Sequence, residues 1–139
     1  MGNTLTRLCY ASQTVKEENA IRQDLMDILT EAVNFNQRHQ VYGVLYYGGG
    51  KFFQCLEGDS EIVNPLFYEK ITKDPRHTGV ELLDLTEISD VKFGQWHMKY
   101  APYDKAMLGF FNDRGISEFD PFILQEQGLE DFISYLLKV

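Results

Sequence analysis

The stretch from Lys51 to Gly58, which follows three consecutive glycines, constrains the fold more than any other part of the chain. Its side chains alternate as they do in a β-strand, so Phe52, Gln54 and Leu56 share one face. A glutamine between two large apolar neighbours cannot leave its amide unpaired without a cost of roughly 1–3 kcal/mol. Its partner is either a neighbouring loop or a ligand, and the strand alone does not decide between them.

Length and charge limit the classes of protein to which this chain can belong. With 139 residues, 44% of them hydrophobic, it can bury the core of one domain but not of two. The formal net charge of −8 repels nucleic-acid phosphates and anionic lipid, so we expect no direct binding to either. No leader opens the sequence and no apolar run approaches the about 20 residues of a bilayer span, so we expect a cytoplasmic protein.

The cysteines and histidines are not spaced like metal ligands. Cys9 and Cys55 also cannot form a disulfide framework, and we expect buried thiols. His39, His77 and His97 fall on separate predicted elements without carboxylates at metal-ligand spacing, so we expect no metal site.

Hydrophobic periodicity predicts strands and helices in alternation. Strands are expected at 5–11, 41–47, 51–58, 80–88 and 93–100, one helix at 20–36, and a second between 59 and 74. Asn19 or a capping box at Thr14 and Glu17 can begin the first helix. In the second, Pro65 either interrupts a helix begun at Asp59 or follows an N-cap at Asn64.

This order predicts an α+β sandwich of the ferredoxin-like βαββαββ kind, with two helices on one face of the sheet. Residues 1–101 form this domain. Residues 102–139 are too apolar for a disordered tail, and we expect a helical extension that packs on the opposite face. In the last strand, alternation places Trp96 and Met98 on one face and Lys99 on the other.

Several segments together resemble a known family. They are Arg7-Leu8-Cys9-Tyr10, Asn36, Gly49-x-x-Phe52-Phe53-Gln54-Cys55-Leu56-Glu57-Gly58, Lys73-Asp74-Pro75-Arg76-His77 and Trp96-His97-Met98. Their order and approximate spacing resemble BLUF domains, the blue-light sensors that use flavin, over roughly residues 4–102. The tail resembles the helical extension of small stand-alone BLUF proteins.

The resemblance implies a flavin between the two helices, FAD in the first place, with FMN or riboflavin as alternatives. The residues it implies for cofactor binding are Ile28, Asn36, Gln54, Lys70, Ile71, Asp74, Arg76 and His77, and those for the photoswitch are Tyr10, Gln54, Trp96 and Met98. Phe35 departs from the family pattern, in which Asn or His often precedes the ring-binding asparagine.

The resemblance further implies a photoreceptor without enzymatic turnover. It would signal by rearranging hydrogen bonds among tyrosine, glutamine and flavin, and would pass the change through the C-terminal region or the sheet face to a downstream regulatory protein. A homo-oligomer is an open possibility. Two alternatives remain at this point: a flavin-dependent redox enzyme on the same fold, in which His77 is the one evident base, and a cofactor-free interaction domain.

Overall fold

The computed structural model describes residues 4–15, 21–101, 105–116, 119–125 and 128–138. One sheet contains β1 (Leu5–Thr14), β2 (Tyr42–Gly48), β3 (Lys51–Asp59), β4 (His77–Ile88) and β5 (Lys99–Ala101), in the order β4-β1-β3-β2-β5. All neighbours are antiparallel except β5, which runs parallel to β2. This topology confirms the predicted α+β fold of the ferredoxin-like kind.

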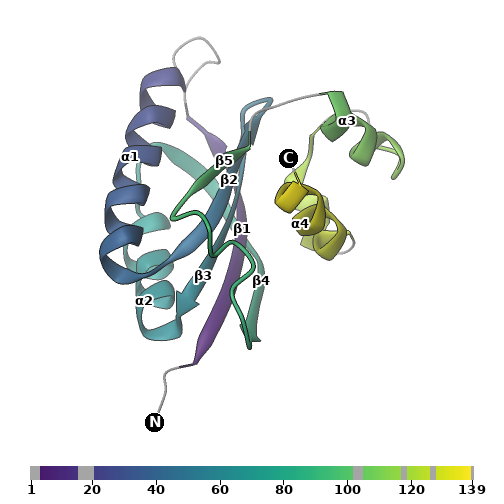
Figure 1. The fold of residues 1–139 in the computed structure, drawn as a ribbon. Helices are drawn as coiled ribbons and strands as arrows, with labels where there is room; N and C mark the ends of the chain where they lie inside the picture. The colour runs from purple at the N-terminus through teal and green to yellow at the C-terminus, as the bar shows by residue number, and fades with distance from the viewer. Residues whose placement is uncertain (1–3, 16–20, 102–104, 117–118, 126–127, 139) are drawn as a thin grey trace.

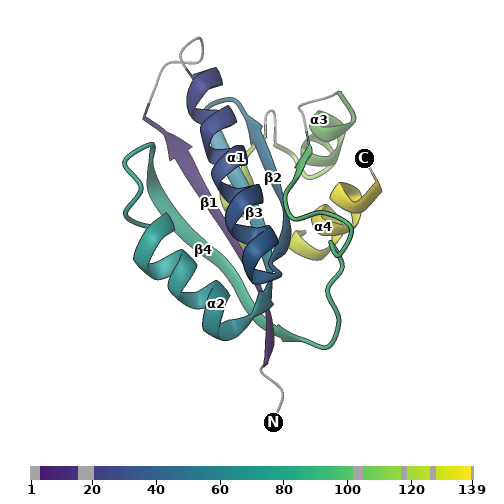
Figure 2. The same ribbon diagram turned by 60° about the vertical axis from the view of Figure 1, so that its left-hand side comes forward.

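Helices cover both faces of the sheet (Figures 1 and 2). One face carries α1 (Ile21–His39), α2 (Ser60–Pro65) and the π-helix η2 (Leu66–Ile71), and the other carries α3 (Lys105–Asn112), the 3-10 helix η3 (Pro121–Gln125) and α4 (Leu129–Lys138). Within the described ranges, no helix is both long enough and apolar enough to cross a bilayer.

The alternation of β1 and β3 divides the core into two clusters of buried side chains. Leu8, Tyr10, Phe52 and Leu56 face α1 and α2, whereas Cys9, Phe53 and Cys55 face the C-terminal helices. Aromatic side chains dominate the second cluster, and the most deeply buried of them are Tyr46, Phe53, Phe93, Phe111 and Phe132. The C-terminal helices therefore share one core with the sheet, as the apolar composition of this region predicts.

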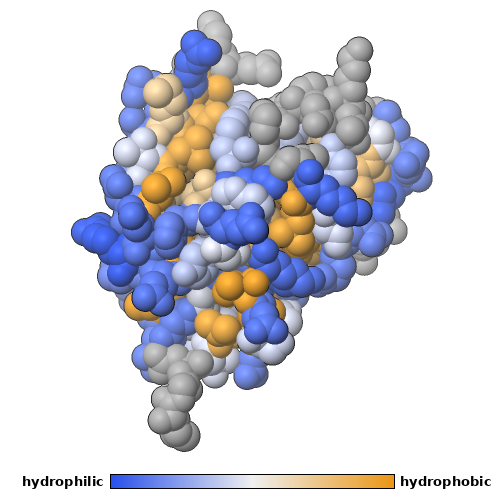
Figure 3. Space-filling view, viewed as in Figure 1, coloured by the Kyte–Doolittle hydropathy of each residue, from blue (hydrophilic) through white to orange (hydrophobic). Residues whose placement is uncertain are grey.

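The molecular surface around α1 contains both apolar and hydrophilic side chains. Figure 3 shows an apolar strip beside α1, bordered by hydrophilic side chains. Exposed apolar side chains include Met26 and Val33 of α1 and Tyr100 of β5.

The hairpin and the first helix agree with the sequence pattern. Gly49 and Gly50 have positive φ angles of 56° and 82° at the turn between β2 and β3, a backbone that glycine adopts without strain. The first helix begins at Ile21 and continues to His39, one turn beyond the predicted end. Of its predicted caps, Asn19 and Glu17 lie outside the described residues.

The second helix follows the first of its two predicted alternatives. Asp59 is the N-cap, because its Oδ1 accepts a hydrogen bond of 2.9 Å from the amide of Glu61. The prediction of an N-cap at Asn64 is therefore wrong. Pro65 has no amide hydrogen, and from Leu66 the chain winds as a π-helix, in which the Thr72 amide bonds the Phe67 carbonyl at 3.0 Å.

The predicted strand at 93–100 is mostly wrong, since only Lys99–Ala101 forms a strand. The cause is Glu57, whose Oε1 accepts hydrogen bonds of 2.8 Å from the amides of Lys92 and Phe93. The amide of Trp96 then bonds the Phe93 carbonyl at 2.9 Å, which closes a turn. These backbone groups are satisfied without a strand ladder.

A candidate cofactor cavity with a tyrosine–glutamine pair

A cavity of about 400 Å³ lies between α1, η2 and the sheet. Ligand sites of proteins typically measure roughly 300–1,000 Å³. All residues predicted to bind the cofactor line this cavity, namely Ile28, Asn36, Gln54, Lys70, Ile71, Asp74, Arg76 and His77. Of the predicted switch residues, Tyr10 and Gln54 line it, whereas Trp96 and Met98 do not.

Tyr10 and Gln54 form a hydrogen-bonded pair on the cavity floor. They are direct partners in the antiparallel register of β1 and β3, and the Tyr10 hydroxyl donates to Oε1 of Gln54. The side chains are almost fully buried, with exposed fractions of 5% and 4%. Burial, with a smaller contribution from the charge of Asp74, raises the pKa of Tyr10. The phenol is therefore protonated at neutral pH and acts as the donor.

The amide nitrogen of Gln54 has hydrogen-bonding capacity to spare. It approaches Sδ of Met98 at 3.7 Å, and a thioether sulfur is a weak acceptor. An amide nitrogen carries two hydrogens, and leaving one unpaired in a buried site is costly. Because Gln54 lines the cavity, a ligand with a carbonyl or ring-nitrogen acceptor would satisfy it.

Asn36 contributes a second buried amide from the last turns of α1. It is 1% exposed, and its Nδ2 donates to the His97 carbonyl at 2.5 Å. This bond ties α1 to the segment before β5. The other amide hydrogen and the oxygen of Asn36 remain available to a ligand in the cavity that it lines.

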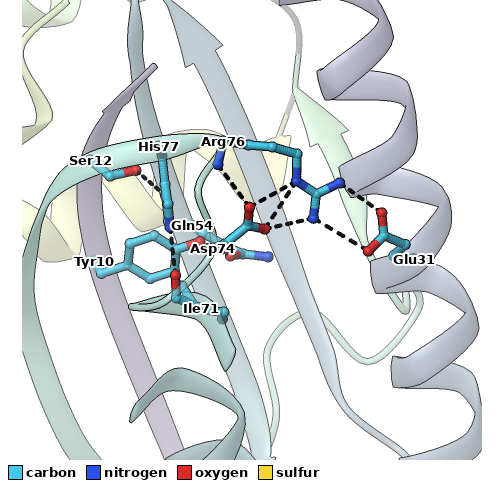
Figure 4. Close-up of polar contacts among 8 residues, drawn as sticks. All are labelled: Tyr10, Ser12, Glu31, Gln54, Ile71, Asp74, Arg76 and His77. Carbon is cyan, nitrogen blue, oxygen red and sulfur yellow. Dashed lines mark hydrogen bonds and ion pairs between the residues drawn. The ribbon is translucent and has the colours of Figure 1, made fainter. Parts of the chain in front are cut away.

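An arginine that lines the cavity has two carboxylate partners (Figure 4). Arg76 donates to Asp74 through Nε at 2.9 Å and through a terminal nitrogen at 2.6 Å, and to Glu31 of α1 at 2.7 Å. Burial alone would raise the pKa of Asp74, but its hydrogen bonds with Arg76 outweigh that effect and lower it. The arginine therefore links α1 to the turn after η2.

The ion pair between Asp74 and Arg76 should make the protein less stable to unfolding in acid. The lowered pKa of Asp74 means that this contribution is complete above the ordinary aspartate pKa of about 3.9 and is lost as pH falls below it. Asp74→Asn should therefore flatten the decline of the urea midpoint between about pH 5 and pH 2. Asp113→Asn, at an exposed position on the opposite side of the molecule, is the control and should keep the parental slope. If the urea midpoint of Asp74→Asn fell with pH as steeply as that of the parent, the stabilising role given to the Asp74–Arg76 pair would be wrong.

His77 connects η2 to β1 through both ring nitrogens (Figure 4). Its Nε2 bonds the Ile71 carbonyl at 2.6 Å, and its Nδ1 bonds the Ser12 hydroxyl at 2.8 Å. A carbonyl oxygen can only accept, so Nε2 carries the hydrogen, and in the neutral ring Nδ1 accepts from Ser12. This leaves the carbon atoms and the face of the ring for contact with a ligand.

Lys70 and Phe35 both line the cavity and contact each other. The ammonium of Lys70 lies 4.6 Å from the centre of the Phe35 ring, close enough for a cation–π contact. Phe35 also packs on His39, with ring centres 4.3 Å apart. Phe35, which departs from the family pattern, is thus in direct contact with Lys70, a residue predicted to bind the cofactor.

The prediction that Trp96 and Met98 share a face is wrong. Met98 belongs to the cluster under α1 and α2, whereas Trp96 packs against the cluster under the C-terminal helices. The turn held by Glu57 breaks the alternation on which the prediction depended. Lys99 lies on the side of the C-terminal helices, as predicted, and its Nζ donates to the Leu136 carbonyl at 2.9 Å.

Sequence reasoning did not find Glu31, Arg38 or Ser12. Glu31 lies three residues after Ile28 on the same helical face, so the 3.6-residue period could have indicated it. Arg38 lines the cavity near the end of α1. Ser12 is fully buried and follows Tyr10 by two residues on β1, and no sequence signal distinguishes it from a core serine.

No metal site is evident in the part of the chain that the structure describes, since no three histidine, cysteine or carboxylate side chains there could hold an ion together.

Comparisons with known proteins identify the family of this chain. The family model described as sensors of blue-light using FAD matches residues 5–99. The photoactivated adenylate cyclase subunit alpha of Euglena gracilis is 35% identical over 100 residues, which are 72% of this chain and 10% of that protein. The blue light- and temperature-regulated antirepressor BluF of Escherichia coli (strain K12) is 28% identical over 136 residues, which cover 86% of this chain and 33% of that protein.

Solved structures give the same result. BlsA in its ground state is 44% identical and superposes with a TM-score of 0.92 over 97% of this chain and 89% of that chain. The photo-activated state of BlsA superposes with a TM-score of 0.91 over 97% of this chain and 96% of that chain. The chain spans only about a tenth of the length of the Euglena cyclase subunit. It belongs to the BLUF family of flavin-based blue-light sensors, because the family model matches more than half of its residues.

Proposed function

We propose that this chain senses blue light through a non-covalently bound FAD in the cavity between α1 and η2, and signals without enzymatic turnover. The observation that carries the proposal is the buried Tyr10–Gln54 pair on the cavity floor, whose amide nitrogen has only a thioether partner. The family description names FAD, which supports FAD over FMN or riboflavin.

The residues around the cavity fit a flavin. Gln54 and Asn36 present amides that can pair with the carbonyls and nitrogens of the ring edge, and Ile28 and Ile71 supply apolar walls. Lys70 supplies positive charge for the ribityl-phosphate part, while Arg76, paired with Asp74 and Glu31, holds Asp74 where it can accept from ribityl hydroxyls. His77 holds the end of η2 so that Lys70 and Ile71 face the cavity.

Gln54 is suited to be the switch because its amide can be set in two ways. In the structure Tyr10 donates to Oε1 and the amide nitrogen is directed to Met98, and we assign this setting to the dark state. Rotation or tautomerisation of the amide exchanges its donors and acceptors with little movement of atoms, which allows two states of similar energy. When bound, the flavin supplies the absorption of blue light and the excited-state redox chemistry that triggers this exchange. After the exchange, the hydroxyl of Tyr10 and the sulfur of Met98 contact a Gln54 amide whose donor and acceptor atoms have changed places.

The output would pass to the C-terminal helices and from there, or from the sheet face, to a regulatory protein. The relative in Escherichia coli is an antirepressor, which supports a protein partner. Similar TM-scores against both states of BlsA support a local rather than a global change on illumination. Both nitrogens of His77 are bonded to protein groups, which argues against a redox enzyme with His77 as its base. The negative net charge argues against direct nucleic-acid binding.

Purification and spectroscopy test the proposal. The protein should be yellow, release FAD on denaturation, and show a reversible shift of its visible absorption after blue light. Identification of the released flavin by chromatography distinguishes FAD from FMN and riboflavin. A protein that stays colourless after refolding with each of the three flavins would refute the photoreceptor, and bleaching coupled to turnover of an added reductant would favour the enzyme.

A further inference from the structure

Helix α4 is attached to the sheet near both of its ends, by two cations from different strands. Near its start, Arg7 of β1 donates to Glu130 at 3.4 Å. Near its end, Lys99 of β5 donates to the Leu136 carbonyl at 2.9 Å. Between them, Phe132 and Ile133 are fully buried, and the Phe132 ring packs edge-on against Phe53 of β3 at 4.9 Å.

The attachment at Arg7 is rigid. Arg7 is 4% exposed, and its Nε bonds Oε2 of Glu57, which is fully buried, at 3.2 Å. The other oxygen of Glu57 holds the amides of Lys92 and Phe93 at 2.8 Å. Displacing either charge would leave the other buried without a partner, which proteins tolerate poorly. Glu130 is 70% exposed and adds little energy, so the packed ring of Phe132 and the buried ion pair fix this end.

The attachment at Lys99 is different, because it adjoins the switch. Lys99 directly follows Met98, whose sulfur contacts the amide of Gln54. Met98 packs in the cluster under α1 and α2, and the side chain of the next residue, Lys99, lies on the side of α4. A shift of the backbone at Met98 therefore moves Lys99 relative to α4. β5 pairs with β2 over only three residues, so it is the least anchored strand of the described sheet.

The ammonium of Lys99 has two partners on the side of the C-terminal helices. It lies 4.2 Å from the centre of the Trp96 ring and against a carbonyl in the last turn of α4. Carbonyls in the last turn of a helix have no donor within the helix, and the negative end of the helix dipole favours a cation there. Burial lowers the pKa of Lys99, in agreement with a partly desolvated ammonium.

We infer that Lys99 is the positioning residue that carries the change at Gln54 and Met98 to the C-terminal end of α4, while Arg7 and Glu57 hold the other end in place. This inference rests on the proposed function. In it, light changes the position of β5, Lys99 loses or lengthens its bond to Leu136, and the last turn of α4 loosens while the first turn does not.

Hydrogen exchange of the flavin-loaded protein in the dark and under blue light tests the inference, with the absorption spectrum recorded on the same samples. In the parent, amides in 135–138 should exchange about tenfold faster in light, the factor expected for one charge-assisted hydrogen bond, with little change in 129–131. Lys99→Met should keep the spectral shift, exchange quickly at 135–138 in the dark, and show no further change in light. Lys99→Arg should restore the light response in part.

Lys92→Met is the matched control, because Lys92 also reaches α4, at 3.9 Å from Glu130, but at the rigid end. It should keep both the spectral shift and the light response of 135–138. A full light response in Lys99→Met would overturn the inference, as would a uniform response along α4 in the parent. A parent without any spectral shift would refute the proposed function instead, so the two failures are distinguishable.

Discussion

Replacement of Gln54 by leucine should give a yellow protein whose absorption spectrum no longer shifts in blue light. Leucine keeps most of the volume of the side chain in the cavity floor but removes the acceptor for Tyr10 and the donor for the ligand. Flavin should still bind through the remaining walls of the cavity. The unfolding free energy should fall by only about 1–2 kcal/mol, because one buried hydrogen bond is lost. Difference spectra before and after illumination measure the effect.

Two further variants sharpen this experiment. Tyr10→Phe removes the hydroxyl that donates to Gln54 and should abolish the shift as well. Gln13→Leu changes an exposed glutamine of β1 and should leave the shift unchanged. A photocycle like that of the parent in either Gln54→Leu or Tyr10→Phe would show that the hydrogen-bonded pair is not the switch.

Replacement of Glu57 by alanine should cause a large loss of stability, comparable to truncation of a fully buried aromatic side chain. It leaves the Arg7 charge buried and two amides without an acceptor. Breaking a buried pair on one side typically costs roughly 3–5 kcal/mol, against a total stability of about 5–15 kcal/mol for a domain. Urea unfolding followed by circular dichroism measures the change.

The double variant Arg7→Met with Glu57→Leu is the matched comparison, because it removes both charges and fills the space with apolar groups. Such replacements are often neutral or stabilising, although here the amides of Lys92 and Phe93 still lose their acceptor. The double variant should therefore be clearly more stable than Glu57→Ala alone. A cost below about 1 kcal/mol for Glu57→Ala would contradict the role given to the ion pair.

Period-two alternation was sufficient to predict the floor of the site. It places Tyr10 and Gln54 on the face covered by α1 and α2, and Cys9 and Cys55 on the face covered by the C-terminal helices. The structure has all four side chains on these faces. The order of elements, with a glycine turn joining β2 and β3, was sufficient for the fold class. The placement of Asp74 and Arg76 came from the family resemblance, since no periodicity identifies residues of a turn as parts of a cavity.

Period-two alternation gave a wrong prediction for residues 93–98. There a side chain of β3, rather than a neighbouring strand, accepts hydrogen bonds from backbone amides. Glu57 lies 35 residues before Lys92 and captures its amide, and nothing in the local sequence of residues 89–98 indicates such a partner. The misplacement of Trp96 follows directly from that one long-range contact. The π-helix is a similar case, because Pro65 signals an interruption but does not specify how the next turn is wound.

Tyr10 and Gln54 face each other because β1 and β3 pair in one register, with Leu8 opposite Leu56 and Ser12 opposite Phe52. A slip of β1 by one residue would turn Tyr10 away from the cavity and set Cys9 or Ala11 in its place. Such a slip would also move Leu8 and Tyr10 into the cluster under the C-terminal helices and Cys9 into the cluster under α1 and α2. The packing that selects the register of the sheet therefore also sets Tyr10 opposite Gln54. The register that forms the sheet and the juxtaposition of Tyr10 and Gln54 are therefore one and the same structural choice.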